Sequence, residues 1–143
     1  MGMGRKRSFD DDEVLARACE VFLEHGYEGT SIDALVKATG LLRGSLYGAF
    51  GSKRGIFVAA LRDATDSESG DSGVLNLVLV ALMELSDHDL EVRGLVRDYL
   101  AKLSSSESDD TNAVALDIAT LLGETLLQRA HIRLQSDDER SKS

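Results

Sequence analysis

The chain has 143 residues, 43% of them hydrophobic and 29% charged, and its formal net charge is −9. A single cysteine, Cys19, excludes an intramolecular disulfide, and no apolar run approaches the roughly 20 residues that a membrane-spanning helix needs. The absence of proline and the scarcity of β-branched residues beside leucine and alanine favour an all-helical protein, either one compact unit or a small domain with a helical appendage.

The negative charge is distributed unevenly along the chain. Residues 1–64 hold nine basic and nine acidic side chains, so the remaining residues carry the whole net charge of −9. The first part is therefore neutral, and the total charge does not exclude nucleic acid as its partner. The acidic second part fits two readings: a half that is kept away from DNA, or a surface made soluble by its charge.

A polar N-terminal segment carries three consecutive basic residues, Arg5, Lys6 and Arg7. They form either an arm that contacts DNA phosphates and the minor groove, or a chain end with solvated charges. The position of the segment directly ahead of the first predicted helix leaves both readings open.

The first helix is predicted over residues 10–25. Acidic residues at its start match the positive end of the helix dipole, and Gly26 is the residue type that commonly ends a helix. Cys19 is expected to be a core thiol rather than a redox sensor. It belongs to a buried stripe at three- and four-residue spacing: Val14, Leu15, Ala18, Cys19, Phe22 and Leu23.

The next stretch, residues 26–53, predicts two short helices joined by a tight turn. Thr30 and Asp33 have the spacing of a capping box at the start of the first of them, which ends near Ala38. Gly40 follows and can reverse the chain with a positive φ at little steric cost. Two helices in this arrangement are the outline of a helix-turn-helix that reads DNA.

The second short helix is predicted over residues 42–48, with Leu46 turned into the core. Arginine can pair with guanine edges, serine and tyrosine hydroxyls can donate to phosphate, and glycine permits close backbone approach. These residue types together suit a helix that lies in the major groove. The outward face is expected to consist of Arg43, Gly44, Ser45 and Tyr47.

An ordered set of residues in this region resembles a known family. The pattern reads G-Y-x-x-T-S-I and then G-x-x-x-G-S-L-Y-x-x-F-x-S-K. The matching residues are Phe22, Gly26, Tyr27, Thr30, Ser31, Ile32, Gly40, Gly44, Ser45, Leu46, Tyr47, Phe50, Ser52, Lys53 and Phe57. The stretch resembles the DNA-binding domain of the tetracycline-repressor (TetR) family of bacterial transcription regulators. The resemblance spans residues 9–61, somewhat under half of the chain.

The resemblance implies an N-terminal three-helix helix-turn-helix domain and a fourth, connecting helix that opens at Ser52. In the family, the lysine that matches Lys53 contacts a phosphate, so we carry this role to Lys53. The expected DNA-binding residues are Arg5, Lys6, Arg7, Thr30, Ser31, Arg43, Gly44, Ser45, Tyr47 and Lys53.

The sequence departs from the family pattern at several positions. Leu42 stands where members often have a serine or threonine that caps the recognition helix. Gly48 and Ala49 stand where many members have a larger aromatic, histidine or polar pair, and Gly55 weakens the start of the fourth helix. These changes reduce the expected number of phosphate contacts and leave the apolar framework intact.

Residues 65–73 are small, acidic and glycine-containing, which predicts a linker between a DNA-binding domain, residues 1–64, and a second domain, residues 74–143. Ser86 and Asp87 are expected to cap the second of three helices there, with Leu90 on its apolar side. The predicted helices are residues 74–85, then from this cap to about 103, and from 110 or 111 to about 134, with a loop at 104–110 and a charged tail at 135–143.

The predicted helices of the second half carry more apolar surface than a monomer of this size can bury. A dimer that packs the last helix against its copy removes this surface from water, and TetR-family proteins dimerise through C-terminal helices. The helix that ends near Leu103 is a further contributor. The expected interface residues are Leu122, Gly123, Leu126, Leu127 and Ala130.

The resemblance also implies a small-molecule effector that binds the C-terminal domain and weakens DNA affinity by changing the separation of the two readers. This chain has fewer C-terminal helices than most members, so the pocket is expected to be either reduced or absent. Each polar candidate can equally be read as a satisfied or surface residue. The candidates are Asn76, His88, Tyr99, Asn112, Thr120, Thr125 and His131.

Enzymatic functions find no support in the sequence. The three histidines lack metal-ligand spacing, and the chain has neither a phosphate-binding glycine-rich loop nor a nucleophile elbow, so no metal or cofactor is expected. The prediction is a cytoplasmic, bacterial DNA-binding regulator, nucleoid-associated when bound, that reads a palindromic operator as a homodimer. Repression is the family's usual mode. The alternative is a helical protein–protein interaction module whose DNA reader is weakened or lost, as the departures at Leu42, Gly48 and Ala49 would allow.

Overall fold

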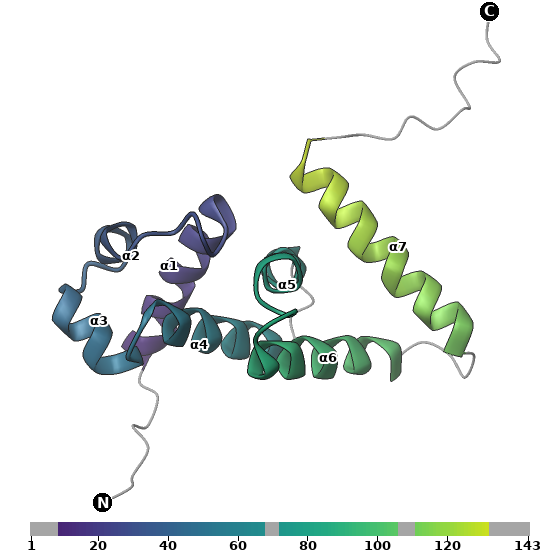
Figure 1. The fold of residues 1–143 in the computed structure, drawn as a ribbon, viewed down its shortest axis with the longest axis horizontal. Helices are drawn as coiled ribbons and strands as arrows, with labels where there is room; N and C mark the ends of the chain where they lie inside the picture. Colours follow the sequence, from purple (N-terminus) through teal and green to yellow (C-terminus); the bar gives the residue numbers. More distant parts are fainter. Residues whose placement is uncertain (1–8, 68–71, 106–110, 132–143) are drawn as a thin grey trace, which may run out of the picture.

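The computed structural model describes residues 9–67, 72–105 and 111–131, and the regular secondary structure in these ranges is entirely helical (Figure 1). The elements are α1 (Phe9–His25), α2 (Ile32–Thr39), α3 (Arg43–Phe50), α4 (Lys53–Asp66), α5 (Ser72–Glu84), α6 (Leu90–Ser105) and α7 (Thr111–Arg129). The all-helical prediction is confirmed, with a three-helix unit, a fourth helix behind it and a helical second half. Within these ranges, no helix has the length and apolar character needed to span a membrane.

The centre of the first half is the packing of α1 against α4. Phe22 of α1 and Phe57 of α4 are fully buried, and their ring centroids lie 5.0 Å apart in an edge-to-face arrangement. α2 and α3 contribute one fully buried leucine each, Leu35 and Leu46. The apolar stripe that the spacing predicted for α1 is thus buried or half-buried, and α4 lies against it.

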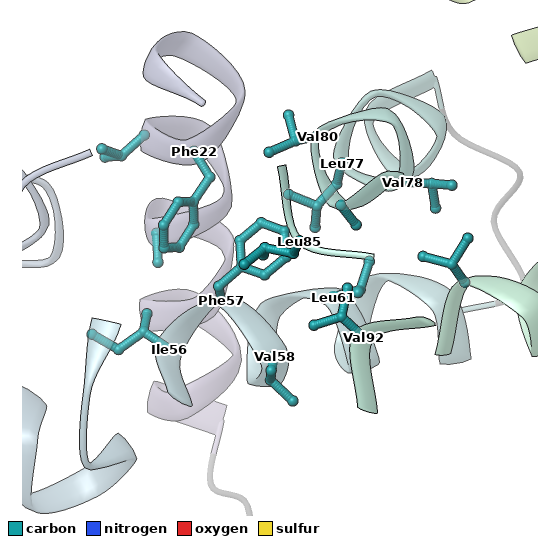
Figure 2. Packing of buried hydrophobic residues seen from close by; sticks show 14 of the residues in the cluster. Phe22, Ile56, Phe57, Val58, Leu61, Leu77, Val78, Val80, Leu85 and Val92 are labelled. Carbon is teal, nitrogen blue, oxygen red and sulfur yellow. The ribbon is translucent and has the colours of Figure 1, made fainter. Parts of the chain in front are cut away.

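The apolar core continues from the first half of the chain into the second. Leu61 of α4, Leu77 and Val78 of α5 and Val92 of α6 belong to the same cluster of buried side chains (Figure 2). α5 packs on both α1 and α4, and α6 packs on α4 and α5. The halves share one core, and the division into two domains at residues 65–73 remains a prediction.

The linker is shorter than predicted, because both neighbouring helices extend into it. α4 continues to Asp66. The Thr65 side chain is buried, and its hydroxyl donates to the carbonyl oxygen of Leu61 at 2.8 Å, which satisfies this polar group inside the helix. α5 already begins at Ser72. The small and acidic residues at 65–73 predicted a loop, but α4 and α5 extend into the two ends of this range.

The start of α6 corrects a second prediction, since neither Ser86 nor Asp87 caps this helix. Asp89 does so, because its Oδ1 accepts a hydrogen bond from the backbone N–H of Val92 at 3.2 Å. The hydroxyl of Ser86 instead donates to the carbonyl oxygen of Ala81 at 2.9 Å, at the end of α5.

Two further details of α6 differ from expectation. Leu90 is its first residue and is 76% exposed rather than on the apolar side, since the buried face begins two residues later at Val92. Ser104 and Ser105, expected in a loop, belong to the helix. Their hydroxyls donate to carbonyl oxygens three residues back, which satisfies them without breaking the last turn.

α7 is the longest helix of the described ranges, as predicted, and it packs against α5 and α6. It ends at Arg129 rather than near residue 134. The chain turns there, since the N–H of His131 donates to the carbonyl oxygen of Gln128 at 3.0 Å and His131 has a φ of 57°. Predictions for the arm at residues 5–7, the loop at 106–110 and the tail at 135–143 fall outside the described residues.

Candidate nucleic-acid interface

The loop between α1 and α2 sets the position of the helix-turn-helix. Gly26 ends α1 with a φ of 72°, a conformation that glycine adopts without strain. Thr30 is buried and its hydroxyl donates to the carbonyl oxygen of Gly26 at 2.6 Å, so Thr30 is not the predicted helix cap. Ser31 caps α2 instead, because its Oγ accepts from the N–H of Ala34 at 3.1 Å. Ser31 is exposed, whereas Thr30 holds the loop from inside.

α3 presents the outward face that the sequence predicted. Gly40 turns the chain between α2 and α3 with a φ of 72°. Leu46 is fully buried and anchors α3 to the core. A Cβ atom at Gly44 would meet no other atom within 4 Å, so the helix surface is open at this point. The exposed residues around it are Arg43, Gly44, Ser45 and Tyr47.

Leu42 stands at the N-cap of α3 and makes no side-chain hydrogen bond, as the departure from the family pattern predicted. Its side chain is 77% exposed. The first backbone N–H groups of α3 therefore lack the side-chain oxygen that Ser31 supplies to α2. Leu42 therefore offers no hydroxyl to a DNA phosphate, which is one contact fewer than a serine or threonine cap would provide.

Arg43 is the only basic residue of α3, and its guanidinium pairs with the carboxylate of Asp33 on α2. Sequence reasoning assigned Asp33 to a capping box and missed this partner. Both side chains remain largely exposed. The outward-facing cation of α3 therefore has a counter-ion of its own on the neighbouring helix.

Lys53 is the first residue of α4 after the Ser52 cap, and it is half-buried rather than free at the surface. Its Nζ donates to the carbonyl oxygens of Tyr27 at 3.1 Å and Thr30 at 3.2 Å, and it lies 4.5 Å from the centroid of the Tyr27 ring. An ammonium group has three N–H donors, so these contacts leave one for an external acceptor. The phosphate contact of Lys53 remains a prediction.

Glu84, the last residue of α5, binds the same loop from the second half of the chain. Its carboxylate accepts from the N–H groups of Tyr27 at 3.2 Å and Glu28 at 2.7 Å. Lys53 thus binds carbonyl groups of the loop and Glu84 binds its amide groups. No role was predicted for Glu84 from the sequence. Because Glu84 and Tyr27 are 57 positions apart, no local pattern could have paired them.

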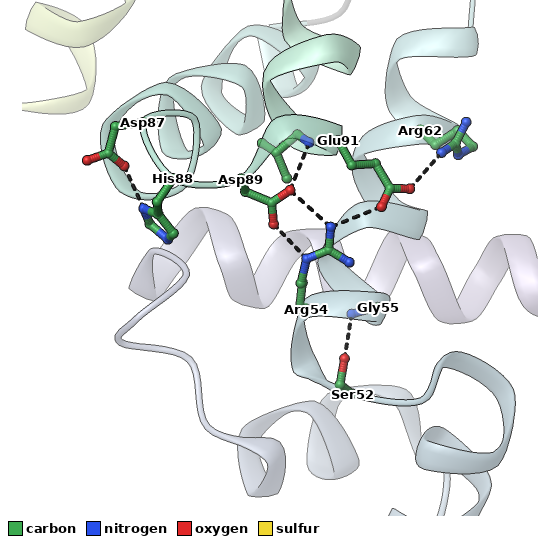
Figure 3. A network of polar contacts seen from close by, with 9 residues as sticks. Ser52, Arg54, Gly55, Arg62, Asp87, His88, Asp89 and Glu91 are labelled. Carbon is green, nitrogen blue, oxygen red and sulfur yellow. Dashed lines mark hydrogen bonds and ion pairs between the residues drawn. The ribbon is translucent and has the colours of Figure 1, made fainter.

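Arg54 connects the start of α4 to the start of α6 through a cluster of charged side chains (Figure 3). Its guanidinium donates to both carboxylate oxygens of Asp89, at 2.6 and 2.9 Å, and to Glu91 at 2.9 Å. Arg62 donates to the other oxygen of Glu91 at 3.1 Å. The hydrogen bond from Arg54 is the main cause that lowers the pKa of Asp89 to about 2, and the two acidic partners raise the pKa of Arg54. These two arginines are engaged with the second half rather than offered to an outside partner.

A cleft of about 310 Å³ lies between α1, α4 and the first turn of α5. None of the polar residues considered as effector contacts lines this cleft. Cys19, expected in the core, is half-buried at its wall. Among the effector candidates, burial raises the pKa of Tyr99, and the hydroxyl of Thr125 donates to the carbonyl oxygen of Leu121 at 2.7 Å. The side chain of Asn112 and the basic cluster of residues 5–7 lie outside the described part.

The chain is similar to known bacterial regulatory proteins. Residues 14–60 match the family described as "Bacterial regulatory proteins, tetR family". The HTH-type transcriptional regulator YezE of Bacillus subtilis (strain 168) is 34% identical over 113 residues, which are 79% of this chain and 53% of YezE. The HTH-type transcriptional repressor ComR of Escherichia coli (strain K12) is 47% identical over 58 residues, 41% of this chain and 28% of ComR. The chain therefore spans about half or less of the length of these curated relatives.

Two solved structures share the fold. A cysteine mutant of the TetR family transcriptional regulator CifR, complexed with a 26 bp double-strand operator DNA, has a TM-score of 0.58 and 24% identity, covering 90% of this chain and 91% of that chain. The fatty acid degradation regulator FadR from Bacillus halodurans has a TM-score of 0.59 and 19% identity, covering 85% and 84%. These likenesses extend across both halves of the chain, so the arrangement of α5 to α7 behind the helix-turn-helix is shared as well.

Proposed function

Because the chain belongs to the tetR family of bacterial regulatory proteins, we propose that it is a DNA-binding transcriptional regulator that acts as a repressor. The observation that carries the proposal is the outward face of α3, where Arg43, Ser45 and Tyr47 are exposed while Leu46 fixes the helix to the core. An outward helix with arginine and hydroxyl side chains is suited to the major groove. The relative ComR is named as a repressor, which supports this mode of action.

The proposed DNA contacts divide into base reading and phosphate binding. Arg43 reads a guanine edge, while the hydroxyls of Ser45 and Tyr47 and the Nζ of Lys53 bind phosphate. Gly44 lets the backbone approach. Ser31 adds a phosphate contact from the exposed start of α2. Thr30 contributes by holding the loop, since its hydroxyl is used inside the protein. The basic residues Arg5, Lys6 and Arg7 are proposed to follow the backbone beside the groove.

We further propose that two copies bind a palindromic operator through a dimer of α7. Leu126 is 41% exposed, and its spacing of three and four residues from Gly123 and Ala130 places the three on one side of α7. Gly123 and Ala130 are small and exposed, which allows close approach of a second helix. Leu122 and Leu127 are partly buried at the edges of this face.

Release by a small-molecule effector completes the proposal. Its support is the pair of polar connections between the halves: Glu84 binds the loop before α2, and Asp89 and Glu91 bind Arg54 at the start of α4. A ligand that shifts α5 or α6 would act on both connections and so displace the reader. Because a bacterial regulator must reach chromosomal DNA, we propose that the protein acts in the cytoplasm.

The proposal is tested by fluorescence-anisotropy binding to DNA from upstream of the protein's own gene, with a scrambled duplex as the control, at several salt concentrations. We expect selective binding whose affinity falls steeply with salt. Weak binding without preference, combined with no enrichment from a pool of random duplexes, would contradict it. That result would favour the alternative of a helical interaction module. The supporting observation for this alternative is that Leu42 provides no side-chain cap at the start of α3.

A further inference from the structure

A carboxylate is an unusual neighbour for the one cation of a DNA-reading helix. We propose that Asp33 is a specificity-determining residue: it orients the guanidinium of Arg43 and repels phosphate, so that binding depends on bases more than on charge. This inference rests on the proposed function, because it concerns how the same surface discriminates between DNA sequences.

The geometry leaves Arg43 able to read a base while it is held. The guanidinium has five N–H donors, and its contact with Asp33 uses one terminal nitrogen. A bidentate contact to guanine O6 and N7 needs two donors, which the remaining nitrogens supply. Arginine has a long side chain with many rotamers, and a partner on a neighbouring helix restricts them before DNA arrives.

The same contact weakens attraction to phosphate in general. Both side chains are largely exposed, 56% for Arg43 and 83% for Asp33, so the carboxylate lies at the surface that DNA approaches. With Asp33 beside it, Arg43 adds no net charge to the outward face of α3. Non-specific binding follows the number of cations that displace counter-ions from DNA, and Asp33 lowers that number by about one. Because exposed ion pairs are weak, the pair with Asp33 does not prevent Arg43 from binding a well-placed guanine.

The test begins with selection of duplexes from a random pool by the wild-type protein. The best selected duplex and a scrambled copy are then titrated by anisotropy against the wild type, Asp33→Asn, Arg43→Ala and the double variant. We expect Asp33→Asn to tighten binding to scrambled DNA and to reduce the ratio of selected to scrambled affinity about three- to ten-fold. The slope of log affinity against log salt should steepen by about 0.9 on scrambled DNA.

Three controls separate this role from a general one. Glu20→Gln removes the same charge from an exposed position of α1 away from Arg43, and it should change neither the ratio nor the slope. Asp33→Glu keeps the charge and should retain most of the selectivity. Arg43→Ala identifies the guanine that Arg43 reads, since substitution of this base should no longer change the affinity of the variant for the duplex. In the Arg43→Ala background, Asp33→Asn should cause no further loss of preference for it.

The outcomes distinguish the two proposals. Wild-type selectivity that Asp33→Asn leaves unchanged, with thermal unfolding confirming that the variant is folded, overturns the role of Asp33 and leaves the regulator intact. An equal effect of Asp33→Asn and Glu20→Gln overturns it as well. Failure of the wild-type protein to enrich any duplex overturns both proposals together.

Discussion

The backbone and its surroundings require glycine at position 26 but not at position 48. Alanine at the two positions should therefore change the free energy of unfolding in opposite directions. Gly26 has a φ of 72°, and a Cβ there would lie 2.5 Å from Oε1 of Glu84. Gly48 lies inside α3 with no atom within 4 Å of its Cβ position. Gly26→Ala should lower the free energy of unfolding by about 1–2 kcal/mol or more, and Gly48→Ala should raise it by about 0.5–1 kcal/mol. Urea denaturation followed by circular dichroism measures both, and changes of the same sign would contradict the assignment.

Lys53 and Arg43 should differ in what their loss does to DNA binding. Lys53→Ala should weaken binding to matched and scrambled duplexes alike, because phosphate contacts carry no sequence information. Arg43→Ala should cost about 1–3 kcal/mol at its preferred base and relax specificity there. Anisotropy titrations on both duplexes measure the difference. Equal losses for the two variants on both duplexes would refute this division.

Lys53→Ala needs a control for folding, because the side chain also supports the loop. Its ammonium binds the carbonyl oxygens of Tyr27 and Thr30. Lys53→Arg keeps the charge and provides the matched variant. Both proteins should be compared at a temperature where circular dichroism shows them fully folded.

Asp89 predicts how stability responds to acid. Its pKa in the folded protein is about 2, below the ordinary value near 3.9, because Arg54 binds the ionised carboxylate. The ionised group therefore stabilises the fold above about pH 4, and this contribution disappears as the pH falls towards 2. Since Arg54 is partly exposed, solvent screening limits the contribution to about 1 kcal/mol. The stability difference between wild type and Arg54→Met should shrink between pH 5 and about pH 2.5 in urea titrations, and a constant difference would exclude the pair as its source.

At the scale of helices, local signals allowed accurate predictions. Gly40 and Ser52 sit where the sequence placed a turn and a helix start, since a positive φ and an N-cap are requirements of a few neighbouring residues. Gly55 seemed a weak choice for α4, yet a Cβ there would collide with the carbonyl oxygen of Phe50, so only glycine fits. This contact with Phe50 explains the glycine, and helix propensity does not take such a contact into account.

The wrong predictions of helix caps, at the starts of α2 and α6, chose between several capping residues close together. Ser86, Asp87 and Asp89 can all cap a helix, and Asp89 is selected because Arg54 of a distant helix binds its carboxylate while Val92 supplies the N–H. Glu84 likewise acquires its role from the loop that packs against it. Such contacts join residues more than 30 positions apart, and the sequence carries no period or spacing that marks them.

α7 carries the prediction that concerns assembly. Leu126→Arg places a charge on the exposed side of α7 that Leu126 shares with Gly123 and Ala130, and it should convert a dimer into a monomer, because a buried unpaired charge is unfavourable at an interface. Light scattering at micromolar concentration measures the mass. Leu90→Arg is the matched control, since Leu90 is 76% exposed and is the first residue of α6 rather than part of α7. A single-chain mass for the wild type would defeat the dimer.

One apolar core joins the helices from α1 to α6, which predicts that they unfold as a single cooperative unit. Leu77 of α5 is fully buried in the cluster that also contains Phe22 of α1 and Val92 of α6. Leu77→Ala should cost about 2–5 kcal/mol and should lower the protection of α1 and α6 together in native-state hydrogen exchange. Unchanged protection of α1 would show that the helix-turn-helix folds independently of the second half.

The bond between Glu84 and the loop after α1 bears on the exchange of parts between regulators. The stretch that matches the family ends at residue 60, whereas the acceptor that its loop requires lies at position 84. A chimera that grafts this reader onto a foreign helical body would therefore leave the N–H groups of Tyr27 and Glu28 without their carboxylate. Transplanting the reader with a glutamate supplied at the end of the recipient's first body helix, opposite Gly26, is the design rule that follows.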